Sequence, residues 1–260
     1  MIYNFNAREQ YENCVNWISN WFSQFPEDKV AVIGMSGGKD STIAAALIAT
    51  AIGPERVIGV AMPDKNQGIN DADKICEHLG IKFINFNIGD IVSAFGNSTT
   101  LEFSSQTKTN IPPRVRMTVL YAIAQSCNGF PVNTCNLSED YIGYSTIFGD
   151  LAGAFSPIKE FTVTELLAIG DVMGLPKEWV HKTPDDGLPC SCPDEQKFGF
   201  TYKELDKYIR EAKTPIGLNG EDVTEKINRM HNNNKFKNEI IRIPAYIPNN
   251  IYSEINLRSF

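Results

Sequence analysis

The chain has 260 residues, enough for one large α/β domain or two small ones. Its net charge of -7 argues against a general nucleic-acid-binding protein, and no apolar run approaches the roughly 20 residues that a membrane-spanning helix needs. The six cysteines are scattered and the first residues carry no secretory pattern, so we expect reduced thiols and a cytoplasmic protein.

The first third of the chain alternates helical and strand patterns. Apolar residues at helical spacing predict a helix over residues 8–22, with an aromatic face in the core or at a subunit contact. Apolar, β-branched runs predict strands at residues 30–33, 57–62 and 81–87. Helices are predicted from near residue 41 to residue 50 and over residues 71–79. This order predicts an α/β fold with a doubly wound, mainly parallel sheet flanked by helices.

A glycine-rich loop joins the first strand to the helix that follows. Such a loop exposes backbone N–H groups at a helix N-terminus and favours a polyanion. Two serine hydroxyls, the Lys39 ammonium and the Asp40 carboxylate add donors, positive charge and a Mg²⁺ ligand. It is not a Walker A loop, because Lys39 stands where that motif has its second glycine. The alternative is an ordinary Gly/Ser turn. The predicted loop comprises Gly34, Met35, Ser36, Gly37, Gly38, Lys39, Asp40 and Ser41.

Two arginines follow in the middle of the chain. Residues 90–95 are predicted as a short helix and the polar residues 96–107 as a mobile segment near the site. A helix is predicted over residues 110–125, with prolines at its start, where they are tolerated. Arg114 and Arg116 would then lie in its first turns. Such a pair is usually a solvated face, but cations oppose the helix dipole there, so we infer an anionic partner.

A fourth strand is predicted at residues 131–135. Thr134 and Glu139 fall at or just past its end, at the edge where open parallel sheets bind ligands. Glu139 has two interpretations: a second carboxylate for a metal held by Asp40, or a surface acid in a loop.

The remainder is predicted as helices separated by loops. Residues 161–173 form a helix with a capping box from Thr162 to Glu165. The long loop over residues 181–195 contains Cys190 and Cys192, but no second Cys/His pair has metal spacing, so a zinc site is weakly supported.

The last elements show no linker or repeat, so we predict one domain over residues 1–260. A second capping box, from Thr201 to Glu204, begins a helix that continues through residue 209. Residues 221–231 are predicted as the last helix, and the residues from 232 onward as an extended, partly basic tail.

Four stretches resemble the ammonia-dependent NAD synthetase family of the ATP pyrophosphatase superfamily. The first, residues 34–41, contains the Ser-Gly-Gly-x-Asp-Ser loop that the whole superfamily shares. The stretches that point to NAD synthesis are residues 110–117, residues 133–139 with 143–150, and residues 182–184 with 194–195 and 198–202. The resemblance implies an adenine nucleotide alpha-hydrolase-like fold and a homodimer. It also implies ATP-driven amidation of deamido-NAD by ammonia, through an adenylate. A glutaminase domain does not fit in this length.

The resemblance also implies residue roles. The loop and Thr134 would bind ATP, with Lys39 and Asp40 catalytic, and Asp40 and Glu139 would bind Mg²⁺. Deamido-NAD would lie partly across the subunit interface and contact Arg114, Asn234 and Lys235.

The sequence departs from the family pattern at four positions. Ile147 stands where a basic residue is usual, and Ala154 where an acid is usual. Val163 replaces a frequent lysine, and Asp185 a frequent Ser or Thr. These departures keep two alternatives open: another adenylating ATP pyrophosphatase with a different acceptor, and a non-catalytic nucleotide-binding protein.

Overall fold

The computed structural model describes residues 3–69, 71–182, 193–240 and 245–248. Its sheet has four parallel strands in the order β3-β2-β1-β4, which confirms the predicted parallel, doubly wound sheet. From β1 the chain moves outward to β3 and then returns to the other side of β1 for β4. A reversal of this kind opens a crevice at the carboxyl ends of the two strands beside it, here β1 and β4. The strands are β1 (Val30–Gly34), β2 (Val57–Ala61), β3 (Lys82–Asn85) and β4 (Gly129–Val132).

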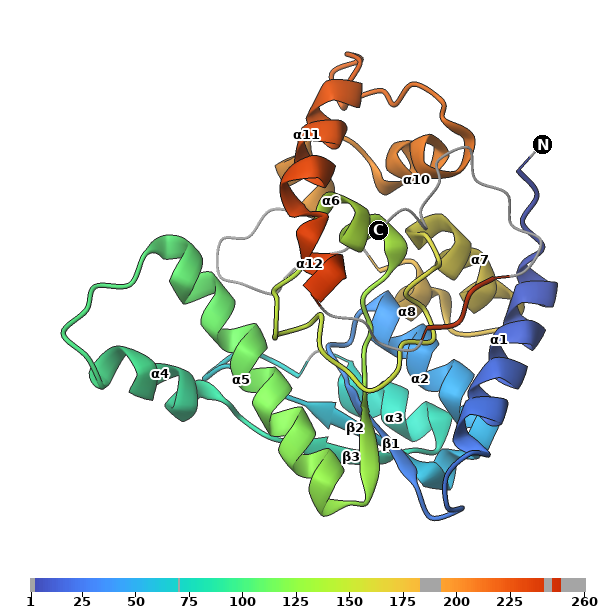
Figure 1. Ribbon diagram of the computed structural model, residues 1–260. Helices are drawn as coiled ribbons and strands as arrows, with labels where there is room; N and C mark the ends of the chain where they lie inside the picture. Colours follow the sequence, from blue (N-terminus) through green and yellow to red (C-terminus); the bar gives the residue numbers. More distant parts are fainter. Residues whose placement is uncertain (1–2, 70, 183–192, 241–244, 249–260) are drawn as a thin grey trace.

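Helices cover both faces of the sheet (Figure 1). One face carries α1 (Ala7–Phe22), α2 (Lys39–Ile52), η1 (Pro54–Arg56), α3 (Ala72–Leu79), α7 (Val163–Val172) and α8 (Lys177–Val180). The other carries α4 (Gly89–Asn97) and α5 (Ser105–Ser126).

The strands have apolar residues on both faces because helices bury both. Ala31 and Ile33 of β1 pack in the core with α1 and α2, whereas Val32 faces Leu120 of α5. Alternate residues of β1 are therefore buried in two different cores, which explains a continuous apolar run instead of an alternating one.

A second apolar cluster lies beyond the carboxyl end of β4. It joins α6 (Leu137–Ile142), α9 (Asp194–Phe198), α10 (Tyr202–Glu211) and α11 (Thr224–Asn234), with α12 (Phe236–Ile240) continuing beside them (Figure 1). Its buried members include Leu137, Phe200, Leu205 and Ile227. This cluster fixes α6, and with it Glu139, at the crevice edge of the sheet.

The helix with the arginine pair begins earlier than predicted. α5 starts at Ser105, because the Ser104 side chain accepts a hydrogen bond from Thr107 N and caps it there. The prolines at 112 and 113 therefore lie inside the helix. Arg114 and Arg116 are in its middle, so their predicted place in the first turns was wrong and the helix dipole gives no argument for an anionic partner.

Other boundaries also differ. Residues 232–240 are largely helical and do not form the extended tail that we predicted. The Thr162–Glu165 capping box is confirmed. The second box is incomplete: Thr201 accepts from Glu204 N, but the Glu204 carboxylate accepts from Lys207 Nζ and Ile216 N instead.

The predictions about cysteines and membranes concern the whole chain. Cys14, Cys76, Cys127 and Cys135 are free thiols, as predicted. Cys190, Cys192 and Asp185 lie outside the described residues. Within the described ranges, no helix combines the length and apolarity needed to cross a membrane.

Candidate active site

The glycine-rich loop follows β1 and ends at the amino end of α2. Gly37 has a φ of +75°, a conformation that favours glycine over residues with a Cβ. Gly38 is the N-cap residue of α2 and provides no side chain to cap it. The N–H groups of the first helical turn are therefore left for another acceptor. This arrangement is the strand–loop–helix geometry that the sequence predicted; that the loop binds a polyanion stays a prediction.

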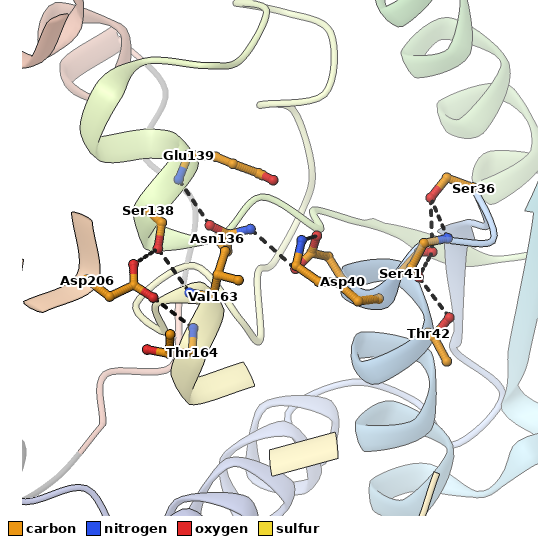
Figure 2. A network of polar contacts seen from close by, with 12 residues as sticks. Ser36, Asp40, Ser41, Thr42, Asn136, Ser138, Glu139, Val163, Thr164 and Asp206 are labelled. Atoms are coloured by element: carbon orange, nitrogen blue, oxygen red, sulfur yellow. Dashed lines mark hydrogen bonds and ion pairs between the residues drawn. The ribbon is translucent and has the colours of Figure 1, made fainter. Parts of the chain in front are cut away.

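Hydroxyl groups hold the loop in this shape. Ser36 Oγ accepts from Gly38 N at 3.2 Å. Ser41 Oγ and Thr42 Oγ1 both donate to the Gly38 carbonyl oxygen, at 3.1 and 2.8 Å (Figure 2). Three side chains thus fix the backbone of Gly38, and the loop is preorganised before any ligand enters.

Lys39 is a buried cation surrounded by acids. Its side chain is 5% exposed and its Nζ lies 2.8 Å from Asp40 Oδ2. Burial would lower the pKa of Lys39, but the charges of Asp40, Glu139 and Asp194 outweigh it and raise the pKa. The ammonium therefore stays charged at neutral pH, as phosphate binding requires.

Asn136 connects the loop to the end of the next strand. It is fully buried and caps α6, accepting from Glu139 N at 3.0 Å through Oδ1. Its Nδ2 donates to Asp40 Oδ1 at 3.2 Å (Figure 2). One amide side chain thus holds Asp40 of α2 next to the amino end of α6, across the β1–β4 crevice.

Glu139 lies on α6 and not in a loop. Burial, followed by the charge of Asp40, raises its pKa well above the usual range. Figure 2 shows the carboxylate extending from α6 on the same side as Asp40. Two neighbouring acids repel each other unless a cation is present. Because Glu139 is half-buried and lies on a helix, its interpretation as a surface acid in a loop is wrong.

Asp206 of α10 holds α6 in place through Ser138. Its carboxylate accepts from Ser138 Oγ at 2.5 Å and from Thr164 N at 2.8 Å, and Ser138 Oγ in turn accepts from Val163 N (Figure 2). Because Ser138 precedes Glu139, this network ties α6 to the start of α7 through α10.

The residues predicted to contact a dinucleotide are more dispersed. Arg114 Nε donates to the Ile147 carbonyl oxygen at 3.2 Å, and no hydrogen bond or ion pair among the described residues joins Arg114 to the loop. Asn234 Nδ2 donates to two backbone carbonyl oxygens, of Ile142 and Met230. Lys235 is exposed and Thr134 half-buried.

Three of the departures from the family pattern can be located. Val163 is 4% exposed inside the second apolar cluster, so a lysine there would need its charge compensated. Ile147 is half-buried, and its carbonyl oxygen accepts the hydrogen bond from Arg114 described above. Ala154 pairs its N–H with the Pro131 carbonyl oxygen at 2.8 Å, beside β4.

Sequence reasoning missed three of the polar residues around the acids. For Asn136 a signal existed, since Asn followed three residues later by Glu is a helix-start pattern. Tyr202 lies in the stretch 198–202 that carries the family resemblance, but we assigned it no role. For Asp206 no signal existed, because it reaches the site only through the packing of α10.

Comparisons with known proteins agree with this geometry. The family model described as NAD synthase matches residues 10–241. The NH(3)-dependent NAD(+) synthetase of Methanocaldococcus jannaschii is 36% identical over 82% of this chain and 87% of that protein. The NMN synthetase structure from Francisella tularensis has a TM-score of 0.79 at 32% identity, over 95% of this chain and 100% of that one.

A further solved structure supports the fold. The NH3-dependent NAD synthetase from Campylobacter jejuni has a TM-score of 0.73 at 24% identity, over 92% of this chain and 99% of that one. These neighbours have the adenine nucleotide alpha-hydrolase-like fold, which confirms the predicted fold class. The chain therefore belongs to the NAD synthase family of ATP-using carbon–nitrogen ligases.

Proposed function

We propose that this protein catalyses the ammonia-dependent amidation of deamido-NAD to NAD. The nicotinate carboxylate attacks the α-phosphate of ATP, which forms an adenylate and releases pyrophosphate. Ammonia then attacks the activated carbonyl carbon and displaces AMP. The observation that carries the proposal is the hydrogen bond from Asn136 to Asp40, which brings the polyanion loop and the amino end of α6 together at the crevice of the sheet.

Residues 34–41 would bind the phosphates of ATP, with Thr134 contributing from the end of β4. The uncapped first turn of α2 and the charged Lys39 side chain favour negative charge there. As pyrophosphate departs, these groups would neutralise the charge that develops on it, and we expect this electrostatic stabilisation to dominate catalysis. We assign no general base.

Asp40 and Glu139 are the residues that would hold Mg²⁺. The raised pKa of Glu139, caused by burial and by Asp40, fits a pair of acids that a cation would stabilise. Mg²⁺ commonly uses one or two carboxylates together with substrate phosphates. Among the described residues, no cluster of three or more His, Cys, Asp or Glu could hold a metal ion. When bound, the ion would supply charge neutralisation for the leaving pyrophosphate.

Arg114, Asn234 and Lys235 are our candidate contacts for deamido-NAD. Arg114 lines a cavity of about 150 Å³ between α4 and α5, together with Ile91, Phe95, Val115, Thr118 and Val119. An exposed guanidinium beside an apolar cavity suits an anionic group attached to a flat ring. The donors of Asn234 are already used, so Lys235 is the stronger candidate on α11 and its C-cap.

A second acceptor, nicotinate mononucleotide, is favoured by a specific observation. The chain matches an NMN synthetase over almost its full length. It also has Ile147 and Ala154 where the family resemblance leads us to expect charged residues, one of which contacts deamido-NAD. A mononucleotide lacks the adenylate half and needs fewer such contacts. Comparison of kcat/KM for the two acceptors separates these candidates.

We also propose that the protein is a cytoplasmic homodimer, that residues 1–260 form one domain, and that free ammonia or a partner supplies the nitrogen. Exposed apolar side chains on α4 and α5, including Ile91, Phe95 and Tyr121, support a subunit contact on this face. The four free thiols among the described residues suit a reducing compartment.

The test is pyrophosphate release from Mg·ATP with deamido-NAD, with and without ammonium, while NAD is followed. We expect both products only in the complete mixture. Asp40→Asn should lower pyrophosphate release by about 100-fold or more while the fold stays intact by circular dichroism. Asp28→Asn is a control, since Asp28 is exposed, precedes β1 at the opposite end of the sheet and accepts a hydrogen bond from Asn128.

The outcomes distinguish the candidates. Pyrophosphate without NAD would leave the ATP loop correct and the acceptor wrong. No pyrophosphate with either acceptor would favour a nucleotide-binding protein without catalysis. An Asp40→Asn variant with normal turnover and normal Mg²⁺ dependence would refute the assignment of the metal site.

A further inference from the structure

Tyr202 has a buried hydroxyl group that no described residue hydrogen-bonds. It is the first residue of α10 and is 3% exposed. Its backbone N–H donates to Glu195 Oε1 at 2.8 Å, and its ring packs edge-on against Phe198 at 6.0 Å. The backbone and the ring are therefore held, and only the hydroxyl is unsatisfied. Native proteins rarely bury such a group without a partner, because desolvating it is costly.

The hydroxyl lies among the charged groups of the candidate active site. Lys39 Nζ is 5.6 Å from the centroid of the Tyr202 ring. Burial and then the charges of Glu139, Asp194 and Asp40 raise the pKa of the phenol, so these three carboxylates lie close enough to act on it. The group is thus protonated and can donate a hydrogen bond, yet none of these acids accepts one from it.

We propose that Tyr202 is a further binding residue for Mg·ATP. The Tyr202 hydroxyl would donate a hydrogen bond to an oxygen atom of the Mg²⁺–triphosphate group. Lys39 and Asp40 belong to the polyanion loop, so a ligand next to them presents phosphate or metal-bound water oxygens. A phenol that donates to a phosphate oxygen makes a charge-assisted hydrogen bond. This inference rests on the proposed function, because it requires the loop to bind Mg·ATP.

The experiment uses Tyr202→Phe, which removes only the hydroxyl oxygen and its proton. Binding of α,β-methylene-ATP with Mg²⁺, which cannot release pyrophosphate, is measured by calorimetry without any acceptor. We expect a Kd about tenfold higher than for the wild type, since hydrogen bonds to charged groups are among the stronger ones. The melting temperature without ligand should stay equal or rise, because the missing hydroxyl leaves no partner unpaired.

Tyr208→Phe is the matched control. Tyr208 lies on the same helix, and its hydroxyl donates to Asn228 Oδ1 at 2.7 Å. This variant should melt at a lower temperature, because Asn228 loses its donor, and should bind the analogue with unchanged Kd. The two tyrosines are thus expected to show opposite patterns of stability and binding.

The possible results separate this inference from the proposed function. If the wild type does not bind the analogue, the assignment of the loop fails and the inference fails with it. If the wild type binds and the Tyr202→Phe Kd lies within twofold of it, only the inference is overturned. An increased KM for ammonia with an unchanged Kd would also overturn it, because the hydroxyl would then serve the second step.

Discussion

Replacement of Asn136 by alanine tests whether one amide sets the relative position of the two acids. In the wild type, Oδ1 accepts from Glu139 N at 3.0 Å and Nδ2 donates to Asp40 Oδ1 at 3.2 Å. Alanine keeps the backbone and removes both bonds. We expect the protein to be less stable. We also expect that α6 no longer fixes the position of the Asp40 carboxylate.

The magnitude follows from the two bonds. Loss of an N-cap hydrogen bond costs about 1 kcal/mol. The Asp40 carboxylate, which is 19% exposed, loses a hydrogen bond to a charged group, and such bonds are worth about 1–3 kcal/mol. Because Asn136 is 0% exposed, water cannot easily replace the amide. The free energy of unfolding should therefore fall by about 2–4 kcal/mol, which in a chain of this size lowers the melting temperature by roughly 5–15 °C.

Two measurements check this prediction. Calorimetry gives the melting temperature without ligand, and a titration gives the Mg²⁺ concentration for half-maximal pyrophosphate release. That concentration should rise about tenfold, as is typical when a residue that orients a metal ligand is removed. The matched control is Asn6→Ala. Asn6 caps α1 through the same bond, to Glu9 N at 3.2 Å, but contacts no acid of the site.

The control also defines the refutation. Asn6→Ala should lower the melting temperature slightly and leave the Mg²⁺ dependence unchanged. If Asn136→Ala is no worse than Asn6→Ala in both measurements, the Asn136 amide does not couple Asp40 to α6, and the reasoning fails.

Two further predictions concern Asp206 and Gly143. Burial raises the pKa of Asp206 to about 6, above its unfolded value of 3.8, so unfolding releases a proton between these pH values. The free energy of unfolding should therefore fall as the pH rises through this window, by roughly 3 kcal/mol more in the wild type than in Asp206→Asn, as measured by urea unfolding. If the two proteins lose stability equally with pH, the prediction is contradicted. Gly143→Ala would place a Cβ 2.0 Å from Asn234 Cβ at a φ of +69°. It should cost about 1–3 kcal/mol more than Gly220→Ala, whose φ is +85° with no described atom nearby; equal unfolding free energies would show that Asn234 moves freely.

The sequence alone was sufficient for features that depend on neighbours in the chain. The apolar run of β1 and the positive φ of Gly37 are local, and so is the cap that starts α7. Local propensity and backbone sterics decide such features, which is why the glycine-rich turn between β1 and α2 and the order of the strands and helices before α4 were predicted correctly.

Local signals misled where two of them competed. Two prolines in α5 matched a helix start, but the Ser104 cap and the packing of α5 against β1 and β4 set the start earlier. The outcome changed the environment of Arg114, which lies in mid-helix. A proline inside a helix is tolerated when tertiary contacts stabilise the remainder.

Only the tertiary structure decided which polar groups meet. Asn136 and Asp40 are separated by 96 residues and Ser138 and Asp206 by 68, so no local pattern joins them. They meet because β4 pairs with β1 and because α10 packs on α6. The sequence determined the chemistry of each end of these contacts. Strand order and helix packing, which depend on burial summed over the whole chain, determined their partners.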